Sequence, residues 1–118
     1  MVNKDLVRLR HMFDSSSAIL DFLKGKRKSS LKANRMLASA VFREFEVLGE
    51  AAGKISQKTR DLYPELPWKQ LVGIRNRLIH AYFDISYDII WKTAKDHLPL
   101  LHRQLEKVIS EFEKNLTN

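Results

Sequence analysis

Apolar residues recur at intervals of three and four along most of this 118-residue chain, the spacing that gathers side chains on one side of an α-helix. The first such stripe runs from Lys4 to about Lys24. Its apolar residues are Leu6, Leu9, Met12, Phe13, Ile19, Leu20 and Leu23. Gly25 then marks the end of the helix, because glycine readily takes the left-handed conformation that closes helices.

A second, longer stripe predicts a helix from Ser30 to about residues 56–59. Its apolar residues are Leu31, Leu37, Val41, Phe45, Leu48, Ala52 and Ile55. Gly49 and Gly53 lie inside this helix, where each glycine costs about 1 kcal/mol relative to alanine. We therefore expect another element to approach closely along this small surface.

Residues 63–68 read Tyr-Pro-Glu-Leu-Pro-Trp and predict a loop, because two prolines three positions apart exclude a continuous helix. A third helix is expected to begin at Pro67 or Trp68 and to reach residues 75–82. Both tryptophans of the chain, Trp68 and Trp91, are interpreted as core anchors or as platforms for base stacking.

Two helices are expected in the last third of the chain. Residues 83–86 form a short break, and Ser86 caps a helix that begins at Tyr87. Pro99 lies in the first turn of a final helix that runs to about Asn115. The inner positions of these two helices are Ile89, Ile90 and Ala94, then Leu101, Leu105, Val108, Ile109 and Phe112.

Together these segments predict an all-α protein in which residues 1–118 form one domain, an antiparallel bundle of four to five helices. The absence of cysteine excludes disulfides and thiolate metal sites and fits a reducing cytoplasm. No apolar run approaches a membrane span, and the first residues lack the apolar stretch of a signal peptide. A cytoplasmic protein with no membrane partner is expected.

The charge balance favours anionic partners. The chain has 21 Lys and Arg against 14 Asp and Glu, a net charge of +7, which suits RNA or an acidic protein. Six basic residues crowd residues 24–35, namely Lys24, Lys26, Arg27, Lys28, Lys32 and Arg35. This basic segment is either a patch that follows a phosphate backbone or a solvated turn.

Residues 75–82 read Arg-Asn-Arg-Leu-Ile-His-Ala-Tyr and combine side chains suited to phosphodiester chemistry. Arg75 is a permanent cation that can hold a phosphate by two hydrogen bonds. His80 can transfer protons near neutral pH, and Tyr82 carries a hydroxyl that can be modified. Arg77 is either an auxiliary phosphate contact or a surface charge. Short strings of this kind also occur by chance in helical proteins, so the surrounding sequence decides their meaning.

The spacing of Arg75 and His80 poses a geometric problem. Residues five apart on an ideal helix point about 140° away from each other around the axis. Either the helix loosens near His80, or the site takes the two side chains from different chains. A two-fold dimer would bring two copies of the motif together.

The chain resembles the HEPN domains of bacteria and archaea, specifically the HepT-like toxins that are paired with minimal nucleotidyltransferase antitoxins. The segments that carry the resemblance are residues 48–55, 63–68, 73–83, 88–91 and 98–99. The family implies a helical bundle that forms a two-fold homodimer, with an Arg-x4-6-His signature in a cleft between protomers. It also implies a metal-independent ribonuclease with an RNA substrate.

The resemblance assigns roles to four residues, and the position of Glu50 leaves that residue with two readings. Arg75 and His80 are the catalytic pair, and Asn76 fills the polar position that commonly follows the arginine. Tyr82 is the residue to which the partner nucleotidyltransferase transfers AMP, which silences the toxin. Glu50 either orients Arg75 or His80 or faces solvent between its charged neighbours. The implied protein is the toxin of a type VII toxin–antitoxin system, a homodimer or a hetero-oligomer with its antitoxin.

The chemistry of such a site needs no added cofactor, because RNA supplies its own nucleophile in the 2′-hydroxyl. His80 would transfer protons, Arg75 would stabilise the charge that develops on phosphate, and the products would be a 2′,3′-cyclic phosphate and a 5′-hydroxyl. No metal site is expected, since ligand spacing is absent among His11, His80, His97 and His102. His97 is assigned to the junction before Pro99, and His102 to a solvated face.

Two alternatives remain at this point. Tyr82 is either an accessible hydroxyl beside the cleft or a buried ring whose hydroxyl is satisfied. The protein as a whole is either the ribonuclease toxin or a non-catalytic subunit that binds RNA or nucleotide, or that supports a nucleotidyltransferase. The presence of His80 favours the enzyme, because a binding subunit has no need of the imidazole.

Overall fold

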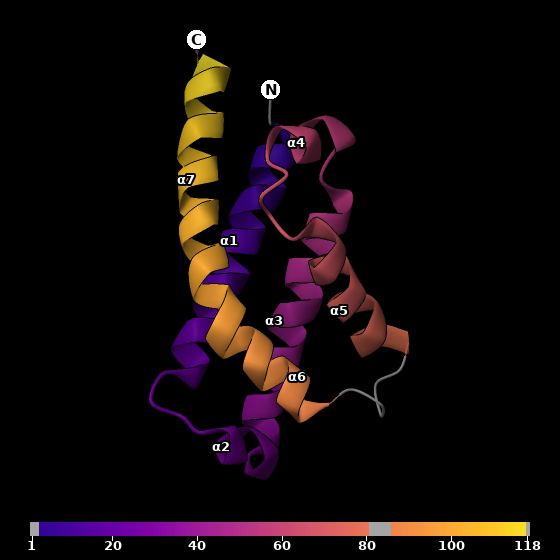
Figure 1. The fold of residues 1–118 in the computed structure, drawn as a ribbon, viewed down its shortest axis with the longest axis vertical. Coiled ribbons are helices and arrows are strands. Elements are labelled where there is room, and N and C mark those ends of the chain that lie inside the picture. Colours follow the sequence, from indigo (N-terminus) through magenta and orange to yellow (C-terminus); the bar gives the residue numbers. More distant parts are fainter. Residues whose placement is uncertain (1–2, 81–85, 118) are drawn as a thin grey trace.

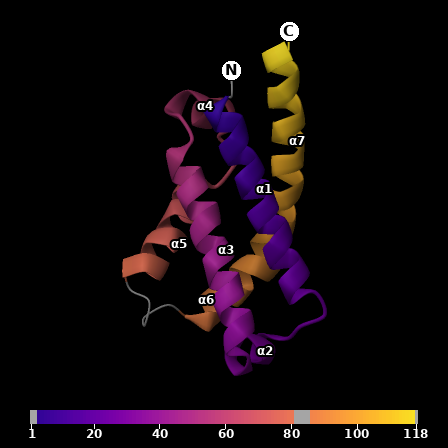
Figure 2. The same ribbon diagram turned by 180° about the vertical axis from the view of Figure 1, so that it is seen from behind.

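The computed structural model describes residues 3–80 and 86–117. Within them the chain forms seven α-helices and one π-helix and no strand, so the all-α prediction is confirmed. Helices α1 (Lys4–Leu23), α3 (Arg35–Lys54) and α5 (Trp68–His80) run in alternating directions (Figure 1). Seen from behind they lie side by side, with α3 between α5 and α1 (Figure 2).

The last helical run lies in front of α3 and α1 in the view of Figure 1. It consists of α6 (Tyr87–Lys92), the π-helix η2 (Thr93–His97) and α7 (Leu98–Thr117), and α7 packs against α1 (Figure 1). Pro99 lies in the first turn of α7, as expected. The π-helix precedes it, and within this turn the amide of Leu98 donates to the carbonyl of Thr93, five residues back. A π-helical turn at this position accommodates Pro99, which has no backbone N–H to donate to the preceding turn.

The single long helix predicted from Ser30 to residues 56–59 is wrong. The chain there forms three helices, α2 (Lys28–Ala33), α3 and α4 (Gln57–Leu62). Asn34 separates the first two because its Oδ1 accepts a hydrogen bond from the amide of Leu37 at 3.0 Å. Ser56 separates the last two by accepting from the amide of Thr59 at 3.3 Å. Asn and Ser side chains compete in this way with the helical backbone and start a new helix.

Other predicted helix ends are confirmed. Gly25 closes the turn after α1 with φ +71°, a conformation that favours glycine. Ser86 caps α6, since its hydroxyl accepts from the amides of Asp88 at 3.1 Å and Ile89 at 3.4 Å. The inward orientation expected for Ile89 is wrong: its side chain is 39% exposed, because Ile90, one position and about 100° further round the helix, takes the inner face.

The core lies between α1, α3 and α7. Its largest fully buried side chains are Phe45, Leu9, Met12, Ile19, Leu23, Leu31, Leu48, Leu78, Ile90, Leu98, Leu105 and Val41. Trp68 joins this core, and its buried indole N–H donates to the carbonyl of Tyr63 at 3.0 Å. Trp68 is thus a core anchor. Trp91 is half-buried, with the ammonium of Lys95 4.8 Å from its ring centre.

The expectation that His102 lies on a solvated face is wrong. Its half-buried imidazole stacks on Phe13, with ring centres 4.4 Å apart and planes 23° apart. It also shares a hydrogen bond of 2.8 Å with the hydroxyl of Ser17. These contacts join α7 to α1. His97 lies at the junction before Pro99, as expected.

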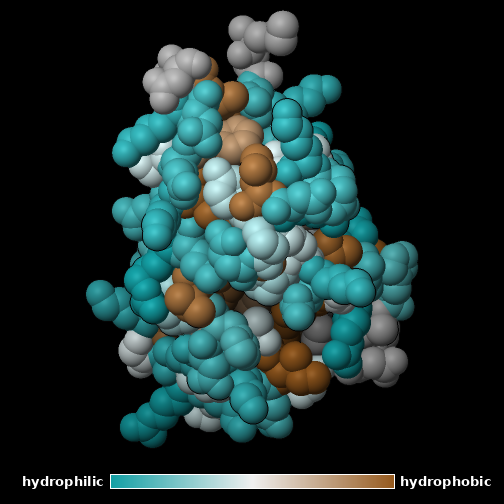
Figure 3. All heavy atoms as spheres, turned by 45° about the horizontal axis from the view of Figure 1, so that its top comes forward, coloured by the Kyte–Doolittle hydropathy of each residue, from teal (hydrophilic) through white to brown (hydrophobic). Residues whose placement is uncertain are grey.

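The surface is mostly hydrophilic. On the face in Figure 3, hydrophobic side chains occur in separate small groups among hydrophilic ones. The basic segment 24–35 is exposed apart from Ser30 and Leu31, and Lys28 pairs with Asp88 at 3.1 Å, which joins α2 to α6. None of the helices in the described ranges combines the length and the apolar character that crossing a membrane requires.

Candidate active site

Close packing of α3 against α5 positions Arg75. Gly49 faces α5, and a Cβ atom at that position would lie 2.3 Å from the Cβ of Arg75 and 2.5 Å from the carbonyl oxygen of Leu71. Both distances are far below contact distance, so only glycine fits. At Gly53 the same added atom would lie 3.5 Å from Val72, an ordinary contact. The close approach predicted from the two glycines is confirmed, and it is tightest at Gly49.

Arg75 lines a depression of about 210 Å³ between α3 and α5. The depression is lined by Gly49, Glu50, Gly53, Lys54, Val72, Arg75 and Asn76. Within the described part of the chain the buried Nε of Arg75 has no hydrogen-bond partner, whereas Nη1 donates to Oδ1 of Asn76 at 3.1 Å. A buried donor without a partner costs free energy, and an anionic oxygen that bound there would recover it.

His80 is the exposed last residue of α5. The helix is α-helical through His80, so loosening of the helix does not bring the two side chains of the motif together. On this helix the backbone positions of Arg75 and His80 are separated by about 7.5 Å along the axis and about 140° around it. One copy of the chain therefore presents the two residues in different directions.

Asn76 partly bridges this angle. It lies four residues before His80, so the two side chains are about 40° apart and share the exposed face of α5. The hydrogen bond from Arg75 to Asn76 therefore links the guanidinium to a residue that shares a helix face with His80. The sequence alone assigned Asn76 an auxiliary place, and the structure places its amide oxygen in hydrogen-bond contact with Arg75.

The remaining predicted site residues lie in different surroundings. The exposed carboxylate of Glu50 pairs with Lys54 at 3.3 Å, on the rim of the depression. Arg77 is exposed and borders a separate groove of about 610 Å³ between α5 and the η2–α7 run. Tyr82 lies outside the described residues. Among the described residues no group of three His, Asp or Glu side chains is arranged to hold a metal ion.

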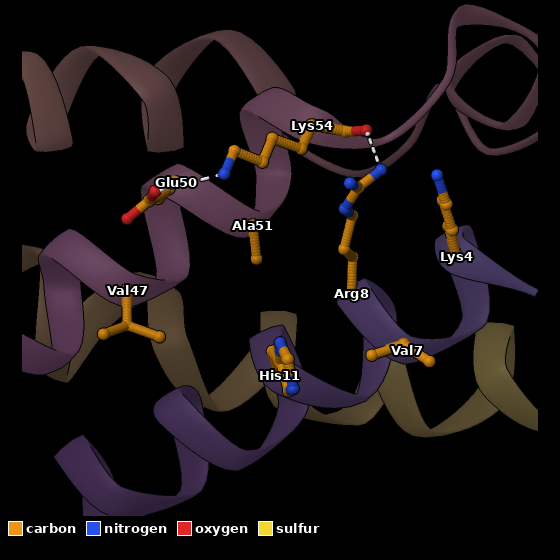
Figure 4. A pocket seen from close by; sticks show the side chains of 8 residues that line it. All are labelled: Lys4, Val7, Arg8, His11, Val47, Glu50, Ala51 and Lys54. Atoms are coloured by element: carbon orange, nitrogen blue, oxygen red, sulfur yellow. Dashed lines mark hydrogen bonds and ion pairs between the residues drawn. The ribbon is translucent and has the colours of Figure 1, made fainter.

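The structure adds a second basic surface that the sequence analysis did not single out. A groove of about 520 Å³ runs along the surface where α1 meets α3, and its lining includes Lys4, Arg8 and His11 (Figure 4). These three residues fall at positions i, i+4 and i+7 of α1, which is the spacing of one helix face. That spacing was the available signal, but it does not show which helix the face meets.

Comparison with known proteins identifies similar chains. A family model described as ribonuclease HepT-like matches residues 12–108. Two proteins of Methanocaldococcus jannaschii that carry RNase names are 39% identical over 95 residues and 36% identical over 100 residues. The first match covers 80% of this chain and 78% of the relative, the second 85% and 92%. A Thermococcus cleftensis protein named "Probable ribonuclease HepT" is 41% identical over 69 residues, 58% of this chain and 63% of its own length. No solved structure gives a significant match.

Proposed function

Because the chain belongs to the HepT-like ribonuclease family, we propose that it cleaves RNA with Arg75 and His80 as its catalytic residues. The observation that carries this proposal is the state of Arg75. Its stem is held against Gly49, its buried Nε has no partner among the described residues, and Nη1 is linked through Asn76 to the face that carries His80. A preorganised cation and an exposed imidazole are the two groups that cleavage of a phosphodiester requires.

The proposed reaction is an internal transfer within RNA. The 2′-oxygen forms a bond to phosphorus, and the bond between phosphorus and the 5′-oxygen breaks. One His80 imidazole accepts the proton of the 2′-hydroxyl, and a second, protonated imidazole donates a proton to the leaving 5′-oxygen. Arg75 stabilises the negative charge that grows on the non-bridging oxygens. The products are a 2′,3′-cyclic phosphate and a 5′-hydroxyl, and no step requires a metal ion.

Two imidazoles imply two chains, and we propose a two-fold homodimer that joins the two motifs across one cleft. Two observations support it. The angle of about 140° between Arg75 and His80 persists because α5 stays helical through His80. The same helix also leaves apolar surface uncovered: Ile79 is 43% exposed, and the half-buried Ile74 lines the 610 Å³ groove. A symmetric partner would cover such surface.

The activity is tested by incubating the purified protein with RNA in the presence of a chelator and mapping the ends. We expect His80→Ala to abolish cleavage, and Lys69→Ala, an exposed charge on the same helix, to retain it. Fragments from the unaltered protein should end in a cyclic phosphate. A 3′-hydroxyl at the first cut would contradict the proposed chemistry. If both the unaltered protein and His80→Ala leave RNA intact, the non-catalytic alternative is favoured.

We further propose that the protein is the toxin of a type VII toxin–antitoxin system, controlled through Tyr82 by a minimal nucleotidyltransferase. Tyr82 follows His80 by two residues, so an adenylyl group on its hydroxyl would add bulk and a negative phosphate close to the catalytic residues. That phosphate would compete with RNA for Arg75.

Control through Tyr82 is tested by co-expression with such a nucleotidyltransferase. Mass spectrometry should show one adenylyl group on the unaltered protein and none on Tyr82→Phe. The variant should still cleave RNA and should remain toxic to bacteria in the presence of the partner. Silencing of Tyr82→Phe by the nucleotidyltransferase as efficient as that of the unaltered protein would refute this mode of control.

A further inference from the structure

The groove between α1 and α3 combines cationic and apolar side chains. Its cations are Lys4, Arg8 and Lys54, with His11 beside them, and Glu50 is the one carboxylate in its lining (Figure 4). Its remaining lining residues are Val7, Val47 and Ala51. A surface of this composition is complementary to a chain that carries regular negative charges alternating with flat, weakly polar groups.

The groove adjoins the candidate active site. Glu50 and Lys54 line both the groove and the 210 Å³ depression that holds Arg75, so the two hollows lie on opposite sides of the C-terminal half of α3. The order α5, α3, α1 is visible in Figure 2. The separation between the two hollows is therefore about one helix diameter, roughly 10 Å.

Two contacts set the cations of the groove in place. Nη1 of Arg8 donates to the carbonyl oxygen of Lys54 at 2.9 Å, which ties α1 to the end of α3 and, among the described residues, leaves the other guanidinium donors available. The ammonium of Lys54 lies 3.3 Å from Glu50, along the ridge between the two hollows. An exposed pair of this kind is weak, so Lys54 can exchange Glu50 for a phosphate.

We propose that this groove binds the backbone of single-stranded RNA beside the scissile phosphate. Lys4 and Arg8 hold phosphates of the flanking nucleotides, Lys54 contacts the strand where it crosses α3, and the apolar floor receives ribose or base. This inference rests on the proposed ribonuclease function and extends it, because it assigns substrate binding to a surface that contains none of the motif residues.

The test measures RNA binding separately from cleavage. In the background of His80→Ala, fluorescence anisotropy follows the binding of a fluorescein-labelled 12-residue oligouridylate at 50 and 200 mM salt. The groove variant is Lys4→Gln with Arg8→Gln. Its matched control is Arg103→Gln with Lys107→Gln, which removes one Lys and one Arg four positions apart from the exposed side of α7.

The expected effect follows from counterion release. Each phosphate contact with single-stranded nucleic acid contributes about 0.7 to the slope of log affinity against log salt. If the parent protein and the groove variant have equal affinity near 1 M salt, loss of two contacts should weaken RNA binding about 70-fold at 50 mM salt and about 10-fold at 200 mM salt. Arg8→Lys, which keeps the charge and the phosphate contact, should bind RNA within about 3-fold of the parent protein at both salt concentrations, because the number of released counterions is unchanged.

Several outcomes would overturn the inference. Equal losses in the groove variant and the α7 control would show that net charge alone binds RNA. Unchanged RNA affinity together with a changed mass in sedimentation would assign the groove to an interface between protein chains. Circular dichroism and thermal unfolding establish that each variant is folded.

Failure of the groove proposal and failure of the ribonuclease proposal give different experimental results. If the protein cleaves no RNA, the ribonuclease proposal fails, while the anisotropy of the His80→Ala series still reports on the groove. If the protein cleaves RNA, the groove variant should raise KM for the 12-mer and the α7 control should not. Cleavage with equal KM in both would overturn the groove alone.

Discussion

Gly49→Ala tests whether the contact of α3 with α5 positions Arg75. The substitution adds one methyl group, whose carbon would lie 2.3 Å from the Cβ of Arg75 and 2.5 Å from the carbonyl oxygen of Leu71. Neither neighbour is the free end of a flexible side chain. Because carbon atoms in contact lie about 3.5–4.0 Å apart, the two helices must separate by about 1 Å at this crossing.

The expected change in stability is the sum of two opposing effects. Overpacking of a tight contact typically costs about 1–3 kcal/mol, and replacing glycine by alanine inside a helix recovers about 1 kcal/mol. We expect the upper part of the overpacking range, hence a net loss of about 1–2 kcal/mol. Gly53→Ala is the matched control, since its added carbon meets Val72 at 3.5 Å. This control should gain up to about 1 kcal/mol from helix propensity.

The assay is urea denaturation of the unaltered protein and both variants, followed by circular dichroism, with RNA cleavage measured on the same samples. Gly49→Ala should unfold at lower urea than Gly53→Ala, with a difference of about 2–3 kcal/mol. It should also lose activity by about 10-fold or more, because a displacement of about 1 Å at a catalytic residue can cost up to 10²-fold. Equal stability and equal activity of the two variants would refute the reasoning.

Three further predictions follow from other contacts. Asp5→Ala should destabilise the protein by about 1 kcal/mol at pH 7. Partial burial alone would raise the pKa of Asp5. Hydrogen bonds from Ser56 and Thr59 outweigh this effect and lower the pKa below 3.8. This stabilisation is present above the unfolded pKa of about 3.9 and is lost as pH falls through the lower folded pKa. The free energies of unfolding of variant and parent, measured in urea, should therefore converge at acid pH. A difference that stays constant with pH would contradict the assignment. His102→Ala should lower the free energy of unfolding by about 1–2 kcal/mol, since it removes the stacking and the hydrogen bond that join α7 to α1. An unchanged midpoint of thermal unfolding would show that these contacts do not stabilise the protein. Asn76→Ala should lower the rate of RNA cleavage about 10-fold with stability within about 0.5 kcal/mol, and full activity would show that Arg75 needs no such guide.

Much of the helical organisation follows from the sequence because its causes are local. Gly25 and Ser86 act on the backbone within a few residues of themselves, and both predicted ends are confirmed. The division of the second helix at Asn34 and Ser56 was missed because the apolar stripe continues through both positions. Their capping side chains were present in the sequence, but stripe and cap point to different structures there, and the caps prevail.

The candidate catalytic residues were also chosen from the sequence, because their chemistry belongs to the residue types. The arrangement around them was not. Nothing local distinguishes Gly49 from Gly53, yet one lies against Arg75 with no room for a methyl group and the other does not. Similarly, the spacing of Lys4, Arg8 and His11 defines a face of α1 but not the α3 groove that this face borders.

The sequence by itself determined the all-helical class, several helix ends, and the residues whose chemistry suits a phosphodiester. Tertiary structure decided that His102 packs on Phe13, that the guanidinium of Arg75 turns toward Asn76, and that a basic groove lies across α3 from it. The physical reason is the distance along the chain over which each kind of interaction acts. Periodicity and capping act over one or two helical turns, whereas the meeting of two helix faces depends on all the contacts that set how the helices cross.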